Sequence, residues 1–195
     1  MRLPFIVCEV NLRPLIGSEE YGAPGAVCEG RNVDEQRCAM CGGPVDAHDR
    51  QIRFRLPEPV LDSPGQERVP GAWLSHDSPE ASVMMQIPAV GPFVRALLVV
   101  RLTGGYAVTY GVWAGVRPGD LQRAFRVWWE PEYENLRLEG ALANSVPPWG
   151  LLASPVTLAV TGPEHTPYCV GSSDPTLSRV LGQEWPHKDV LETLP

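Results

Sequence analysis

The centre of the chain restricts its possible folds more than any other stretch. Residues 94–103 (VRALLVVRLT) and 106–113 (YAVTYGVW) are rich in β-branched and aromatic side chains, which favour strands. Gly104 and Gly105 lie between them, and paired glycines favour tight hairpin turns because both central residues need a positive φ. Strand-like patterns elsewhere extend this predicted hairpin into an antiparallel sheet of about five or six strands, with candidates at 50–56, 82–88, 155–161 and 166–171.

Two helices are predicted beside this sheet. The first begins at Pro118 and ends before Pro131, since proline suits the first turn of a helix and interrupts a helix further along. Its apolar residues recur at helical spacing, so we expect one stripe that packs on the sheet: Leu121, Ala124, Phe125, Trp128 and Trp129. The second helix begins with Ser173 or Asp174 as its N-cap and Pro175 just inside. The predicted fold class is therefore α+β, with both main helices on one face of the sheet.

The overall charge limits the partners that this chain can have. Its 195 residues carry a formal net charge of −7. A surface that binds nucleic acid needs excess basic charge to displace counterions from phosphates, so we expect no nucleic-acid partner. No apolar run reaches the roughly 20 residues of a membrane-spanning helix, and we expect no membrane association. The predicted location is the cytoplasm, where the five cysteines serve as free thiols or metal ligands rather than disulfides.

The sequence divides into three parts. Residues 1–36 have no regular apolar period and are interpreted as an N-terminal extension. Residues 37–50 hold two closely spaced cysteines and form a short segment of their own. Residues 51–195 carry the strand and helix patterns and are interpreted as the α+β domain.

The strongest chemical motif is CAMCG, which begins at Cys38. Cysteines at this spacing can direct both sulfurs at one metal ion, and a structural zinc ion takes four Cys or His ligands. Cys28 and His48 lie near enough in sequence to complete a Cys3His set with Cys38 and Cys41. We therefore predict a structural zinc-binding knuckle, with a redox pair and a pair of metal-free thiols as the alternatives.

Four further residues are candidates for a binding site, and each has a structural alternative. His76 and Asp77 are a possible acid–base pair, although neighbours in a polar loop more often stabilise a solvated turn. Asn144 and Trp149 lie in a loop (ANSVPPWG) of the kind that often carries function, but Asn144 also suits a bracing role and Trp149 suits a position over the core. The sequence contains no GxSxG motif and no Gly-rich phosphate loop, so no catalytic residue is assigned.

In order and spacing, these segments resemble the bacterial family named domain of unknown function 2199. Its pattern has a Cys-x-x-Cys-Gly knuckle, a Gly-Val-Trp strand that leads into a helix ending in Trp, and a Gly-x-Leu-x-Asn-x-x-Pro segment. The matching residues here are Cys38, Cys41, Gly42, Gly111, Val112, Trp113, Trp128, Gly140, Leu142, Asn144 and Pro147. The chain departs from the pattern at Gly115, Arg117, Ala141 and Pro175, so it resembles a divergent member.

Two classes of function fit these features. The first is a zinc-stabilised, non-enzymatic binding or accessory protein, regulatory or immunity-type, whose acidic surface meets a protein partner. The second is a small-molecule enzyme of a specialised bacterial pathway, with or without a dependence on zinc, with its site between the sheet and the loops at 57–80 and 131–150. We favour the first class because the sequence contains no recognisable set of catalytic residues.

Overall fold

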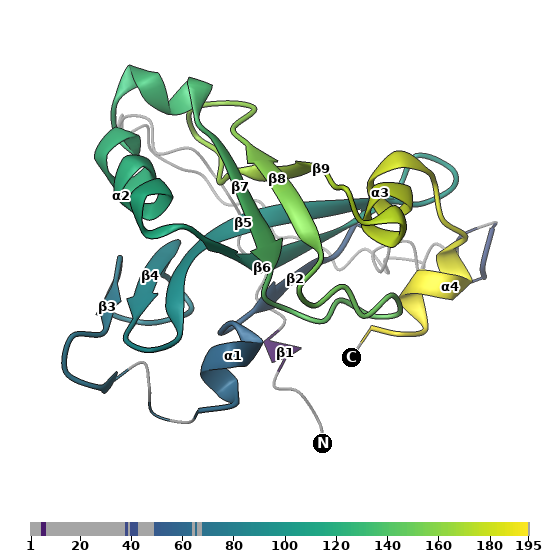
Figure 1. The fold of residues 1–195 in the computed structure, drawn as a ribbon. Coiled ribbons are helices and arrows are strands. Elements are labelled where there is room, and N and C mark those ends of the chain that lie inside the picture. Colours follow the sequence, from purple (N-terminus) through teal and green to yellow (C-terminus); the bar gives the residue numbers. More distant parts are fainter. Residues whose placement is uncertain are drawn as a thin grey trace, which may run out of the picture.

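A computed structural model of the chain describes residues 5–6, 38, 40–42, 49–63, 65 and 68–194 (Figure 1). Within this part, nine strands form one mixed sheet in the order β1-β2-β6-β7-β8-β9-β5-β4-β3. The strands are β1 (Phe5–Ile6), β2 (Gln51–Phe54), β3 (Trp73–Leu74), β4 (Met84–Ile87), β5 (Gly91–Arg101), β6 (Ala107–Val116), β7 (Arg137–Leu142), β8 (Pro155–Ala159) and β9 (Tyr168–Gly171). None of the helices in the described residues has the length and apolar character needed to cross a bilayer.

The predicted central hairpin is confirmed as β5–β6. Its antiparallel register runs from the Phe93–Gly115 pair to the Arg101–Ala107 pair. The turn contains Gly104 and Gly105 with φ values of +83° and +85°. Two successive positive φ angles are strained for residues with a Cβ atom, which explains the paired glycines.

The sheet closes on itself into a five-stranded barrel of β5, β6, β7, β8 and β9, because β6 also pairs with β5. Closure depends on a parallel contact between β9 and β5 at Tyr168 and Leu97, and β2 adds a second parallel pairing to β6. The prediction of a purely antiparallel sheet is therefore wrong. An alternating apolar pattern specifies which face of a strand is buried, but it does not specify the direction of a distant neighbour.

Gly140 allows β7 to approach β6 closely where the barrel closes. A Cβ atom at this position would lie 2.5 Å from the Gly115 carbonyl oxygen and 3.2 Å from Cγ1 of Val116. The first distance is well inside van der Waals contact and involves a backbone atom, which has little freedom to move. The barrel therefore requires a residue without a Cβ atom at position 140.

The helices are α1 (Glu58–Leu61), α2 (Pro118–Val127), η3 (Pro131–Asn135, a 3-10 helix), α3 (Pro175–Gly182) and α4 (His187–Leu191). The two longest, α2 and α3, pack at opposite ends of β5 rather than side by side on one face (Figure 1). At the α3 end, Arg101 donates a hydrogen bond to the Leu181 carbonyl (3.2 Å). Of the two expected N-caps of α3, the structure has Asp174, whose carboxylate accepts from the Leu177 N–H (2.8 Å).

The predicted apolar stripe of α2 is only partly buried. Leu121 and Ala124 lie in the core, and the half-buried Trp128 packs against the ring of Tyr133 at 4.8 Å. Phe125 is 58% exposed and Trp129 is 89% exposed, so the prediction that the whole stripe packs on the sheet is wrong. The helix ends at Val127, so its periodicity does not determine the direction of Trp129.

A buried arginine lies at the centre of the structure. Arg95, in β5, is 2% exposed and contacts several backbone carbonyls. Its guanidinium donates to Phe54 (2.8 Å), Ser82 (2.9 Å) and Pro79 (3.1 Å). Its Cζ atom lies 4.1 Å from the ring centroid of Trp113, a cation–π contact. Burial lowers the pKa of Arg95, and the charge of Arg53 lowers it further.

Asn144 continues this network toward the barrel wall. The buried side chain accepts a hydrogen bond from the Trp113 N–H (2.8 Å) and donates one to the Leu56 carbonyl (2.9 Å). The Trp113 indole donates to the Arg55 carbonyl (3.3 Å). The chain that follows β2 is therefore held by side chains from β5, β6 and the loop after β7.

We expect Arg95→Lys to lower the free energy of unfolding by about 2–4 kcal/mol. Lysine lacks the planar fork of donors, so several buried carbonyls would lose their partners. Urea denaturation measures the change. Arg101→Lys, at an exposed hydrogen bond, is the matched control and should cost less than about 1 kcal/mol. Equal effects of the two variants would show that Arg95 has no special structural role.

We expect Gly140→Ala to destabilise the protein by about 2 kcal/mol or more, because the added methyl group collides with the Gly115 carbonyl. Gly182→Ala is the control, since a Cβ there meets nothing within 4 Å and alanine favours helix. Thermal denaturation of both variants measures the difference. A Gly140→Ala protein as stable as the parent would contradict the close approach of β6 and β7.

Candidate metal centre

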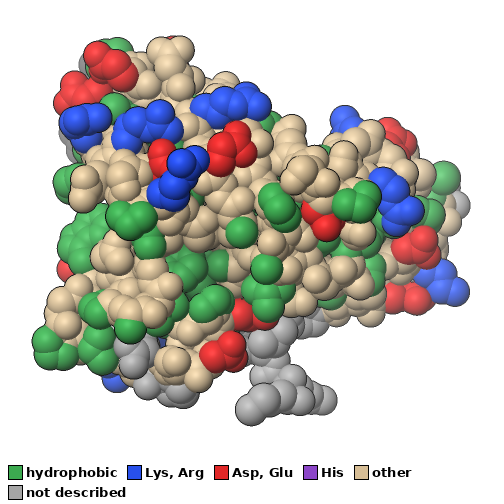
Figure 2. Space-filling model, viewed as in Figure 1, with side chains coloured by type: hydrophobic (Ala, Val, Ile, Leu, Met, Phe, Trp, Pro, Cys, Tyr) green, Lys and Arg blue, Asp and Glu red, His purple; other side chains and the backbone are tan. Residues whose placement is uncertain are grey.

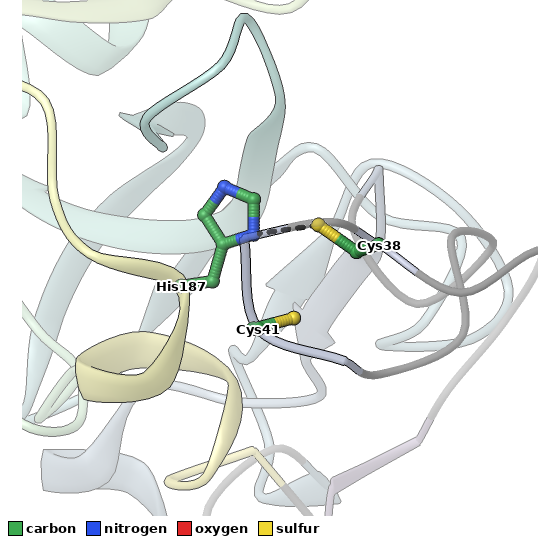
Figure 3. Close-up of side chains that lie close together, drawn as sticks. All are labelled: Cys38, Cys41 and His187. Atoms are coloured by element: carbon green, nitrogen blue, oxygen red, sulfur yellow. Dashed lines mark hydrogen bonds between the residues drawn. The ribbon is translucent and has the colours of Figure 1, made fainter.

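Three side chains capable of binding a metal meet beside the turn of the β5–β6 hairpin: Cys38, Cys41 and His187 (Figure 3). Their ligand atoms all lie within 4.8 Å of one another. Cys38 and His187 are separated by 149 residues, and Cys38 Sγ lies 3.4 Å from His187 Nδ1. The cluster therefore joins the beginning and the end of the described chain.

A tight turn directs the two cysteines to the same place. The Gly42 N–H donates to the Cys38 carbonyl (2.8 Å), and Gly42 has a φ of +71° that favours glycine. The Met40 N–H points back at Cys38 Sγ (3.4 Å). Cys38 is 5% exposed, whereas Cys41 is exposed, so the turn places one sulfur in the protein and the other at the surface.

The segment before α4 positions His187. Trp185 forms a parallel bridge with Leu102, and its backbone exchanges hydrogen bonds with Arg101 (2.9 Å) and Thr103 (3.0 Å). This contact holds the start of α4 against the end of β5. Here His187 is buried and its ring lies edge-on to Tyr106, with centroids 5.5 Å apart.

A hydrogen bond determines which nitrogen of His187 faces the thiols. The Nε2 atom contacts the backbone carbonyl of Thr103, which can only accept, so the proton of a neutral ring is on Nε2. The lone pair of Nδ1 is then directed toward Cys38. Histidines that bind metals usually donate their other N–H to a carbonyl or carboxylate in this way.

The surroundings of Cys38 favour its thiolate. Burial raises the pKa of this thiol, but hydrogen bonds from the backbone N–H groups of Met40 and Cys41 oppose that effect. A further hydrogen bond from the Cys41 side chain acts in the same direction, and the net pKa falls from 9.0 to about 6. Thiolate is the form that binds metals. By contrast, burial raises the pKa of Cys169 to about 12, which keeps that thiol protonated.

Two sulfurs and one imidazole suit a soft or borderline metal ion such as zinc. Zn–S bonds of about 2.3 Å and Zn–N bonds of about 2.0–2.1 Å place tetrahedral ligand atoms about 3.5–3.8 Å apart. The separation of 3.4 Å between Cys38 Sγ and His187 Nδ1 is close to this range. The described residues thus provide three ligands in a suitable arrangement for a metal.

The structure brings together only part of the predicted ligand set. Cys38 and Cys41 lie side by side as expected, while Cys28 and His48 are outside the described residues. Sequence reasoning missed His187, because no local spacing connects it to the cysteines. Tertiary contacts of the preceding segment, including the bridge between Leu102 and Trp185, hold it there.

The other candidate residues in the described part of the chain do not belong to this cluster. His76 and Asp77 are exposed, and the His76 N–H donates to the Ser82 hydroxyl (3.2 Å). The half-buried Trp149 packs against Trp185, with ring centroids 4.9 Å apart, and Asn144 braces the backbone as described above. The positions of Asn144 and Trp149 agree with the structural alternatives considered for them.

The fold and this cluster define a class: a small barrel protein with a candidate Cys2His metal centre beside the turn of the β5–β6 hairpin. The chain belongs to the family described as "Uncharacterized protein conserved in bacteria (DUF2199)", whose profile matches residues 37–169. Cys38 and Cys41 lie inside the matched region, and His187 lies beyond it. No curated protein and no solved structure matches the chain.

Proposed function

We propose that Cys38, Cys41 and His187 bind one zinc ion, and that this ion stabilises a non-enzymatic binding or accessory protein of the bacterial cytoplasm. The observation that carries the proposal is the contact of His187 Nε2 with the Thr103 carbonyl. It leaves Nδ1 free of a proton in the neutral ring and facing the Cys38 sulfur at 3.4 Å. The hydrogen bond to Thr103 thus orients the ring for metal binding.

The role of the ion is to join segments that are distant in the sequence. Cys38 and Cys41 belong to the knuckle, His187 begins α4, and Thr103 belongs to the turn of the barrel hairpin. An ion bound there would cross-link segments that are separated by 149 residues. An ion that binds only the folded chain stabilises it by mass action. This stabilisation is a property of a structural site.

The remaining features favour binding over catalysis. The described residues contain one group of three potential metal ligands, the group at Cys38, and no second such group. His76 and Asp77 are exposed, and the side chain of Asn144 forms hydrogen bonds with the backbone of Trp113 and Leu56. We therefore propose that this chain is a regulatory or immunity-type protein that binds a protein partner.

One observation supports a zinc-dependent enzyme as the second candidate. Cys41 is exposed, so an ion held by three protein ligands would have a position open to solvent. Zinc with three protein ligands and a bound water is the arrangement of hydrolytic sites. X-ray absorption spectroscopy of the zinc-loaded protein separates the candidates: four S or N ligands from protein indicate a structural site, and a light O ligand indicates an open one.

Protein purified without chelators is expected to contain about one zinc per chain by elemental analysis. Cys38→Ser and His187→Gln should each lose most of it, because a structural zinc site needs all its ligands. The matched controls are Cys169→Ala and His76→Gln, which remove the same kinds of side chain elsewhere and should keep the metal. Full zinc content in His187→Gln would exclude the proposed site.

Chelation of the ion is expected to lower the melting temperature and to increase hydrogen exchange in α4 and around Thr103, since these segments lose their link to the knuckle. Exchange in β7 and β8, which contain no ligand, should change little. Calorimetry and hydrogen-exchange mass spectrometry measure the two effects. If chelation alters exchange uniformly or leaves it unchanged, the ion does not cross-link the knuckle to α4 and the hairpin turn.

A further inference from the structure

Two large aromatic side chains are exposed at the C-terminal end of α2, one in its last turn and one just beyond it. Phe125 is 58% exposed and Trp129, four residues later, is 89% exposed. We name this pair the aromatic ridge. Trp73 of β3 meets Phe125 edge-on, with ring centroids 5.4 Å apart, and supports it from beneath. Exposed aromatic residues that are held in place by packing are typical of the central contacts of protein interfaces.

Opposite charges accompany the ridge. Arg126 and Glu130 each follow one of the aromatic residues, are exposed, and make no ion pair with another described residue. Elsewhere on the helix the charges are already paired, since Asp120 lies 3.4 Å from both Arg117 and Arg123. Figure 2 shows hydrophobic and charged side chains of both signs next to each other over the α2 side of the molecule.

This arrangement is complementary to itself. In a twofold-symmetric contact, residue i of one copy meets residue j of the other, and j meets i. If two ridges pack antiparallel, Phe125 and Arg126 of one copy face Trp129 and Glu130 of its partner. Aromatic rings then meet aromatic rings, and each arginine meets a glutamate, on both sides of the axis.

We propose that the aromatic ridge binds a second copy of this chain. The net charge of −7 makes two copies repel at long range, so a contact between copies requires a surface whose local charges cancel. Arg126 and Glu130 meet that requirement. A nucleic-acid ligand would instead need a basic surface without an acidic neighbour. The inference does not depend on the metal centre, which involves none of these residues.

The size of the ridge predicts a reversible dimer. Each large aromatic side chain buries at most about 150–250 Å². Stable interfaces bury about 1,200–2,000 Å² in total, so the four aromatics of two copies provide the centre of a small interface. We expect a dissociation constant on the order of 10–100 μM, which is typical of weak complexes held by a few central residues.

Sedimentation equilibrium of the full chain, from about 5 to 500 μM, tests the proposal and should reveal a monomer–dimer equilibrium. Trp129→Ala should weaken it about tenfold or more. Leu152→Ala, which removes an apolar side chain that is 43% exposed outside the ridge, should leave it unchanged. A chain that stays monomeric throughout, or a Trp129→Ala variant that dimerises as well as the parent, would overturn the inference.

A charge swap tests the twofold geometry itself. Arg126→Glu and Glu130→Arg should each weaken the dimer, because each places like charges opposite one another. The double variant Arg126→Glu/Glu130→Arg should recover most of the affinity. Failure of the double variant to recover would disprove this contact, and zinc content measured on the same samples keeps the result separate from the metal proposal. Near-ultraviolet circular dichroism verifies that all variants are folded.

Discussion

The fold depends on how the positive charge of Arg95 is stabilised inside the protein. A buried guanidinium is costly unless its donors are satisfied, and here backbone carbonyls satisfy them, while the charge of Glu80 favours the protonated form of Arg95. Those carbonyls come from β2 and from the segment before β4. The arginine therefore connects β2 and the segment before β4, which lie outside the five-stranded barrel, to the barrel strand β5. Trp113 covers the charge on one side and, through Asn144, connects it to the loop after β7.

The same hairpin that carries Arg95 also organises the candidate metal centre at its other end. Arg101, Leu102 and Thr103 at the end of β5 hold the segment before α4 by backbone contacts. The Thr103 carbonyl then orients His187. One rigid hairpin thus supports the charged network near its beginning and the ligand cluster near its turn. This common support explains why a metal clasp there would link the knuckle and α4 to the core of the barrel.

The two proposed properties of this DUF2199 member concern separate surfaces. The metal centre lies by the hairpin turn, near the α3 and α4 end of the molecule, and the aromatic ridge lies on α2 at the opposite end of β5. A clasp and a dimer contact can therefore act together without competing for the same residues. The residues of α2 also divide between two roles. Leu121 and Ala124 are buried and stabilise the fold, whereas Phe125 and the following Trp129 are exposed and available to a partner.

Local chemistry made some features predictable from the sequence alone. The β5–β6 hairpin followed from two adjacent glycines, the start of α3 followed from Asp174 and Pro175, and the approach of Cys38 to Cys41 followed from their spacing. Each depends on residues within a few positions of one another. The tertiary structure decided the parallel contact that closes the barrel, the exposure of Phe125 and Trp129, and the presence of His187 beside the cysteines. These depend on which distant segments meet, and a periodic pattern along the chain carries no information about that.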